Sequence, residues 1–363
     1  MIELKEMNIV KLVKKIRNLS IVSLSILFLV VSSVLSACGN STGSSGSKGT
    51  IVVTTYGGTY DKVFKQYVVD PFVKKNPGVN VKLAPYTTVA KLANGGGKNI
   101  DIVSLDDFDI IDIGNKGLLD KMDAKQFSNW NDLYDQTYLK NKEGNTVGLA
   151  VEFGAWGIAY NHEKMNKPTS WNVFWDKEFK GKAAMMNQFI PDIIMTQKLT
   201  GATDSNMKPV WDAFKKVRPN ISQYYSSFSA PEAMFDSGSI EVASWFDGRA
   251  IAMKKQGKPI SFTVPKEGGV LIRGGEGILK SSKNKKMARK FIDFRLDPKV
   301  QANFAKHLYY GPTNKAAKLD NSLVNEGITY GQEAIDRLTV PDWNKILPER
   351  KDWFNQWTEV TSK

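Results

Sequence analysis

The sequence has almost none of the residues that bind metals or form disulfides. It contains 1 Cys and 2 His, His162 and His307, among 363 residues. One cysteine excludes an intramolecular disulfide and a thiolate zinc site, and two distant histidines offer little to a metal centre. An acidic or disordered chain is also excluded, because the net charge is +13 and 42% of the residues are hydrophobic. We therefore expect a globular protein without a cofactor.

The amino-terminal residues predict an export signal rather than part of the fold. A stretch with five basic residues precedes an apolar run over 21–35, and Leu35-Ser-Ala-Cys38 follows. These are the parts of a secretory signal, and the last four residues resemble the bacterial lipobox, whose cysteine carries the lipid. The run is shorter than the roughly 20 residues of a membrane span, which disfavours the alternative of a transmembrane anchor. We expect a signal peptide over 1–37 and a lipid on Cys38.

Residues 38–49 are rich in Gly, Ser and Thr, which predicts a flexible tether between the lipid and a folded domain. The predicted location is the outer face of a bacterial cytoplasmic membrane, at the cell surface or in the periplasm.

The first part of the mature chain alternates between strand and helix patterns. Apolar spacing predicts strands over 51–55, 79–83 and 100–105, with helices over 59–72 and 87–93 between them. This order predicts a parallel α/β sheet. Ligands of such sheets bind outside the carboxyl ends of the strands. The residues expected there are Tyr56, Gly57, Thr59, Asp106 and Asp107.

A second block of similar character begins near Leu149. Strands are predicted over 153–160 and 240–244, and a sharp break is predicted at 265–269. A short aromatic helix is expected over 171–179, and a carboxyl-terminal helix should bury Trp353 and Trp357. Further helices are predicted over 192–199, 206–217, 286–296 and 298–307. Two α/β lobes account for this length.

The chain resembles the extracellular solute-binding proteins of ABC importers, most closely the spermidine/putrescine-binding group. The resemblance runs in collinear order through nearly all of the mature chain. The strings that carry it are Tyr56-Gly-Gly-Thr-Tyr60, Ile100-Asp-Ile-Val103, Gly154-Ala-Trp-Gly-Ile-Ala-Tyr-Asn161, Ser170-Trp171 through Lys180-Gly181, Ala243-Ser-Trp-Phe-Asp-Gly-Arg249, Pro265-Lys-Glu-Gly-Gly269, FIDFRLDPKVQ over 291–301, and Tyr310-Gly-Pro-Thr-Asn314.

This resemblance implies a two-lobe periplasmic-binding-protein fold of type II, with a ligand cleft between the lobes. Residues 50–149 with 267–315 would form lobe 1, and residues 150–266 with 316–363 would form lobe 2. The lobes would close on a small molecule, which the protein delivers to a membrane permease. A nucleic-acid partner and a catalytic role are not expected.

Aromatic and acidic residues are the candidates for ligand contact. Ring faces attract cations, and a carboxylate beside them makes a buried ammonium tolerable. The resemblance assigns ligand packing to Trp245. The neighbouring Asp247 and Arg249 would share a face in an extended segment, whereas a turn at Gly248 would separate them. The other candidates are Tyr60, Trp156, Asn187, Tyr310, Asp106, Glu152 and Glu276.

The sequence departs from the polyamine binders at two places. Asn187 and Gln188 stand where those proteins have acids, so that only Asp192 remains in that segment, and the first strand ends in a Gly-Gly turn. Arg249 and Arg273 suit an anionic group. A polyamine is the first expected ligand, and an amino-acid derivative, opine or aminophosphonate is the alternative. Outside this class, a secreted lipid-anchored enzyme would use a carboxylate pair such as Asp106 and Asp107.

Residues 280–290 contain six basic side chains. A solvated helix start is the simpler interpretation, and contact with an anionic wall polymer or with lipid head groups is the alternative.

Overall fold

A mixed β-sheet of eleven strands organises the computed structural model, which describes residues 49–362. The strand order is β2-β1-β3-β10-β5-β8-β6-β7, with β11 beside β10 and with β4 and β9 beside β5. The strands are β1 (Gly49–Thr54), β2 (Val79–Ala84), β3 (Ile102–Asp106), β4 (Tyr138–Lys140), β5 (Thr146–Asn161), β6 (Ala183–Met186), β7 (Ile221–Tyr225), β8 (Val242–Phe246), β9 (Ile260–Thr263), β10 (Gly269–Ile278) and β11 (Leu338–Thr339).

The sheet has a parallel group at each end and two antiparallel strands between them. β1 pairs in parallel with β2 and β3, and β6 pairs in parallel with β7 and β8. β5 and β10 lie between these groups and run antiparallel to each other and to their outer neighbours. β5 is buried at nearly every position, as expected for a strand that is covered on both faces.

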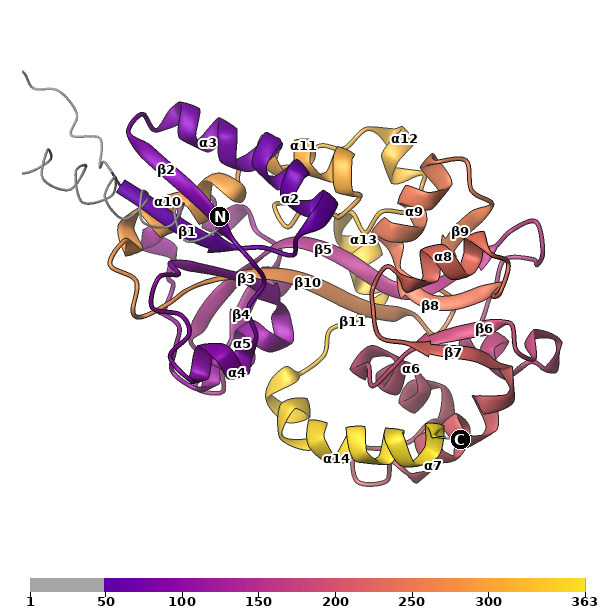
Figure 1. Cartoon of the computed structure of the whole chain (residues 1–363). Helices are drawn as coiled ribbons and strands as arrows, with labels where there is room; N and C mark the ends of the chain where they lie inside the picture. Colours follow the sequence, from indigo (N-terminus) through magenta and orange to yellow (C-terminus); the bar gives the residue numbers. More distant parts are fainter. Residues whose placement is uncertain (1–48, 363) are drawn as a thin grey trace, which may run out of the picture. The chain divides into compact units, whose positions relative to one another are not determined.

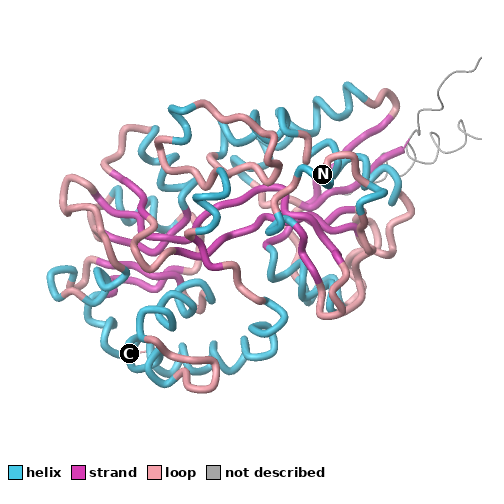
Figure 2. Tube along the Cα trace, turned by 180° about the vertical axis from the view of Figure 1, so that it is seen from behind, coloured by secondary structure: helices cyan, strands magenta, loops and turns pink. Residues whose placement is uncertain are grey.

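Helices lie on both sides of the strands (Figure 1, Figure 2). The α-helices are α2 (Gly58–Phe64), α3 (Asp70–Lys75), α4 (Val89–Ala93), α5 (Asp107–Asn115), α6 (Ile190–Thr200), α7 (Lys208–Val217), α8 (Ala230–Asp236), α9 (Asp247–Lys255), α10 (Lys285–Arg295), α11 (Pro298–Leu308), α12 (Asn321–Val324), α13 (Gly331–Asp336) and α14 (Trp343–Thr361). A π-helical turn, η1 (Lys65–Val69), joins α2 to α3. The 3₁₀ turns are η2 (Ala124–Gln126), η3 (Trp130–Asp132), η4 (Asp135–Thr137), η5 (Trp171–Trp175), η6 (Lys177–Phe179) and η7 (Arg218–Asn220).

Two large hydrophobic cores support the two parallel groups. One includes Ile51, Phe64 and Phe291 and holds β1 and β2 against α10. The larger core contains Trp156 and Trp357 and extends through the second half of the chain. The described residues 49–362 nevertheless lie in one compact unit, and the division into lobes at the predicted residue numbers stays a prediction.

The structure confirms most of the predicted elements, including the strand–helix alternation of the first hundred mature residues and the burial of Trp353 and Trp357. The prediction of one helix over 171–179 is wrong, because this segment forms the two 3₁₀ turns η5 and η6. The extended alternative for Asp247–Arg249 is also wrong, since these residues form the first turn of α9, which agrees with the alternative of a turn at Gly248. The signal peptide, Cys38 and nearly all of the predicted tether lie outside the described residues.

Candidate functional site

Two tyrosines and two aspartates gather where β1, β2 and β3 end. Tyr56 follows β1, Tyr86 follows β2, Asp106 ends β3, and Asp109 lies in the first turn of α5. The rings of Tyr56 and Tyr86 are 6.1 Å apart, and the Tyr86 hydroxyl donates to Asp109 Oδ2 at 2.9 Å. We call these four residues the tyrosine–aspartate cluster. It lies at the edge of the sheet where ligands of α/β proteins bind.

Neither carboxylate of this cluster forms an ion pair among the described residues. Burial, with the negative charges of Asp109 and Asp107 nearby, raises the pKa of Asp106 to about 8. Burial likewise raises the pKa of Asp109 to about 6, although the hydrogen bond from Tyr86 opposes the rise. Among the described residues, Asp106 forms no ion pair. A carboxylate in this environment is stabilised by a cation, and the tyrosine faces beside it favour an organic ammonium.

Gly57 and Thr59 shape the turn beside this cluster. Gly57 has φ 85°, which a residue with a side chain rarely adopts. Its amide donates to Asp61 Oδ1 at 2.9 Å. Gly57 and Thr59 are both exposed, so their predicted role in ligand contact stays a prediction.

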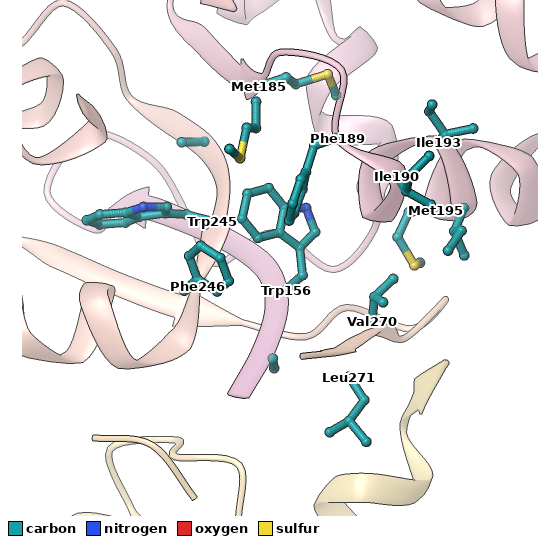
Figure 3. Close-up of a cluster of buried hydrophobic side chains, with 14 of the residues drawn as sticks. Trp156, Met185, Phe189, Ile190, Ile193, Met195, Trp245, Phe246, Val270 and Leu271 are labelled. Atoms are coloured by element: carbon teal, nitrogen blue, oxygen red, sulfur yellow. The ribbon is translucent and has the colours of Figure 1, made fainter. Parts of the chain in front are cut away.

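The tryptophans expected at the ligand are buried in the larger core. Trp156 and Trp245 each have 0% exposure, and Figure 3 shows both among apolar side chains that include Phe189 and Phe246. Trp245 Nε1 donates to the carbonyl oxygen of Phe228 at 2.8 Å. In this structure both rings therefore pack in the core, and their ligand roles stay predictions.

The carboxylate of Asp192 links Trp156 to Ser244 within the larger core. Its carboxylate accepts hydrogen bonds from Trp156 Nε1 at 2.7 Å and from Ser244 Oγ at 3.0 Å. Burial raises the pKa of Asp192 to about 7. Asn187 is exposed at the end of β6, but its Oδ1 already accepts from Trp357 Nε1 at 3.0 Å. The partners of Asp192 indicate a structural role in the core, and the predicted role of Asn187 in ligand contact stays a prediction.

Asp247 and Arg249 point to different neighbours. Asp247 has 0% exposure, and its carboxylate accepts from the Gly248 amide at 2.7 Å and from Thr329 Oγ1 at 2.6 Å. Burial raises its pKa to about 6. Arg249 instead forms an ion pair with Glu232 at 2.9 Å. The structure thus separates the two charges, as the alternative of a turn at Gly248 predicted. Tyr310 is partly exposed beside Gly248.

A buried charge network connects the two central strands to the helices. Arg295 of α10 contacts Glu152 of β5 at 2.8 Å and Glu276 of β10 at 2.7 Å. It also donates to the Tyr60 hydroxyl at 2.5 Å. We call Arg295, Glu152, Glu276 and Tyr60 the arginine network. Burial raises the pKa of both glutamates, and the Arg295 guanidinium opposes this rise.

A second buried pair lies at the start of α5. Arg273 Nε donates to Asp107 Oδ2 at 2.6 Å, and both side chains are at least 94% buried. Three of the predicted acids, Asp107, Glu152 and Glu276, therefore have an internal arginine partner. Among the described residues, Asp106 and Asp247 are the predicted carboxylates that form no ion pair, and Asp247 accepts hydrogen bonds from Gly248 and Thr329 instead.

Sequence reasoning missed Tyr86 and Asp109. The same strand-end rule that selected Tyr56 and Asp106 applies to Tyr86, which follows the predicted strand over 79–83. Asp109 lies three residues beyond Asp106 at the start of a helix that was not predicted. Within residues 49–362, no group of three or more metal-binding side chains comes together. No helix in this part of the chain is long and apolar enough to cross a membrane.

The sequence profile of the family described as bacterial extracellular solute-binding protein matches residues 100–347. The chain belongs to this family. It is a solute-binding protein rather than an enzyme, and its mixed α/β architecture is the two-lobe periplasmic-binding-protein fold.

Three similar proteins illustrate the range of the family. The spermidine/putrescine-binding periplasmic protein of Escherichia coli is 25% identical over 70% of this chain and 77% of its own length. The gamma-aminobutyric acid-binding protein of Pseudomonas aeruginosa is 23% identical over 85% of this chain and 90% of its own. The solved structure of an ABC transporter from Clostridium perfringens is 26% identical, with a TM-score of 0.72, over 86% of this chain and 100% of its own. The similarity to the spermidine/putrescine binders predicted from the sequence is confirmed.

Proposed function

We propose that this protein is the lipid-anchored receptor of an ABC importer and that it captures a small organic cation, with a polyamine as the first candidate. The tyrosine–aspartate cluster carries this proposal. Asp106 has no ion-pair partner among the described residues, and its raised pKa reflects its burial first and then the negative charges of Asp109 and Asp107. An ammonium group supplies the missing positive charge, and Tyr56 and Tyr86 offer it ring faces. The similarity to the spermidine/putrescine-binding protein supports the same ligand class.

A zwitterion with a carboxylate is the second candidate, and Arg350 favours it. Arg350 lies on α14 with 34% of its side chain exposed and pairs with Asp112 at 3.4 Å. Its charge also opposes the rise that burial causes in the pKa of Asp109. An amine held at Asp106 could then extend its anionic end toward this guanidinium. The similarity to the gamma-aminobutyric acid-binding protein supports this alternative, which also covers opines and aminophosphonates.

Calorimetric titration with spermidine, putrescine and gamma-aminobutyric acid tests both candidates. Asp106→Asn is expected to weaken either ligand at least tenfold, because it removes the charge partner of the ammonium. Arg350→Gln is expected to weaken only the zwitterion. Glu163→Gln is the control, since Glu163 is exposed on a loop after β5. The proposal is wrong if the wild-type protein binds none of these ligands at millimolar concentration, or if Asp106→Asn binds as the wild type does.

The lipid anchor is proposed from the Leu35-Ser-Ala-Cys38 tetrad. Two acyl chains hold a protein durably on a membrane. Cys38→Ala is expected to leave the protein unprocessed or released to the medium. A variant that stays on the membrane with the mature mass contradicts the anchor at Cys38.

A further inference from the structure

The edge of the sheet opposite the tyrosine–aspartate cluster is basic. β1 begins at Gly49, and the side chain of Asn284 donates to the carbonyl oxygen of Thr50 at 3.1 Å. This contact places the segment before α10 beside the start of β1, as Figure 1 shows. The exposed lysines of this segment and of the first half of α10 are Lys280, Lys283, Lys286 and Lys290, which we call the basic edge.

The positive charge of the basic edge is not neutralised. None of its four lysines forms an ion pair within residues 49–362. Lys286 and Lys290 are four residues apart on α10 and so share one face of that helix. Lys280 adds to the same edge, because it follows the end of β10, where Ile278 pairs with Ile102 at the start of β3.

The acidic residues near this edge, Asp101 and Asp120, already bind neighbouring groups of the protein. Asp101 is 6% exposed and accepts from the Val52 amide at 2.9 Å and from Ser282 Oγ at 2.5 Å. Asp120 binds Lys285 at 3.2 Å and also Arg289. The basic edge therefore presents net positive charge to whatever lies outside it.

The basic edge lies beside the start of β1, and β1 closely follows the predicted lipid anchor in sequence, which indicates that a membrane surface lies near this edge. Eleven residue steps separate Cys38 from Gly49, and a chain of that length reaches at most about 40 Å. A lipid on Cys38 would keep the start of β1 within this distance of the bilayer. Lysines contribute to membrane binding only when they come within about one screening length, roughly 8 Å at physiological salt.

We propose that the basic edge binds anionic lipid head groups and so holds the amino-terminal edge of the sheet against the membrane. A lipid chain and a polybasic patch are the two signals that together give stable anchoring. This contact directs the tyrosine–aspartate cluster, at the opposite edge of the same strands, away from the bilayer. The free receptor then presents its candidate solute site to the medium.

Vesicle sedimentation with residues 39–363, which lack Cys38 and its lipid, isolates this surface from the anchor. All described strands, helices and cores lie within that stretch. Vesicles of phosphatidylglycerol and phosphatidylcholine in equal parts are compared with vesicles of phosphatidylcholine alone. Binding to the anionic vesicles is expected, and it should be lost when salt rises from about 0.1 M to about 1 M, which shortens the screening length from about 10 Å to about 3 Å.

A variant with all four lysines of the basic edge changed to Gln is expected to bind the anionic vesicles at least tenfold more weakly. The matched control changes four exposed lysines without ion pairs elsewhere in residues 49–362: Lys177, Lys180, Lys215 and Lys216. Thermal unfolding and solute binding of both variants check that the fold is intact.

The proposal is overturned if the basic-edge variant binds as the wild type does, or if the control loses as much binding. Equal binding to neutral vesicles also overturns it, as does binding to an anionic wall polymer without binding to vesicles. None of these results depends on which solute the protein carries.

Discussion

Replacing Arg295 by Met tests the energetics of the arginine network. The guanidinium is 97% buried and pairs with two glutamates, and it also lies 4.5 Å from the centre of the Phe64 ring. Its removal leaves Glu152 and Glu276 facing each other without a positive charge. Breaking a buried pair in this way costs about 3–5 kcal/mol, which is a large part of the roughly 5–15 kcal/mol that stabilises a typical domain. We expect a loss of this size in urea unfolding followed by tryptophan fluorescence.

The loss should depend on pH in a defined direction. Burial already raises the pKa of both glutamates in the folded state, and loss of Arg295 raises it further. Each glutamate thus has a higher pKa in the folded state than its unfolded value of about 4.3. Below that unfolded pKa both carboxyls are protonated in either state, and their burial adds no electrostatic penalty to folding. The penalty then grows as pH rises through the folded pKa. The Arg295→Met defect is therefore expected to be larger at neutral pH than near pH 4.

Two companion variants make the test specific. Adding Glu152→Gln and Glu276→Gln to Arg295→Met should restore most of the lost stability, because no buried charge remains. Arg289→Met is the control, since Arg289 lies on the same helix but is 22% exposed, and its partner Asp120 keeps Lys285. It should cost less than about 1 kcal/mol. An Arg295→Met defect no larger than this control, or one that does not change with pH, would refute the reasoning.

Three further outcomes are expected. Affinity for an organic cation should rise as pH increases through about 8, where Asp106 ionises. Calorimetric titrations in buffers of different ionisation enthalpy should detect proton release on binding, and Asp106→Asn should abolish both effects. Trp245→Ala should lower the free energy of unfolding by about 3–5 kcal/mol, because the ring is fully buried, and unchanged stability would contradict the packing in Figure 3. Saturating ligand, verified by calorimetry, should reduce the radius of gyration in small-angle scattering as the lobes close, and an unchanged radius would count against closure.

The sequence was sufficient to predict that Tyr56 and Asp106 lie at the same edge of the sheet. Tyr56 and Asp106 follow runs of apolar residues whose strand character is plain, and the rule that ligands bind at the carboxyl ends of parallel strands places them together. The same rule would select Tyr86, which lies two residues after β2, but this residue was not predicted. Because Tyr56 and Asp106 lie at the ends of short strands, local pattern alone was enough to locate these two.

The roles of the second half could not be predicted in the same way. β8 is buried at all five positions, so its sequence gives no alternation that would separate a core face from a ligand face for Trp245. Asp247 satisfies its carboxylate with Thr329, which is 82 residues away. The arginine network joins residues up to 235 positions apart. Such partners become visible only when the chain is folded.

The π-helical turn between α2 and α3 sets the rotational phase of one long helical segment. Pro71 lacks the amide that would bond to the carbonyl of Tyr67, and a wider turn accommodates this missing bond. Before the turn, Tyr60 faces the arginine network; after it, the Phe72 ring lies 5.0 Å from that of Phe291.

An α-helix rotates by about 100° per residue. Deleting one residue from the turn would restore a regular α-helix but would rotate either Tyr60 or Phe72 away from its partner. The segment can therefore tolerate substitutions at many exposed positions, whereas the insertion or deletion of a single residue disrupts one of the two contacts.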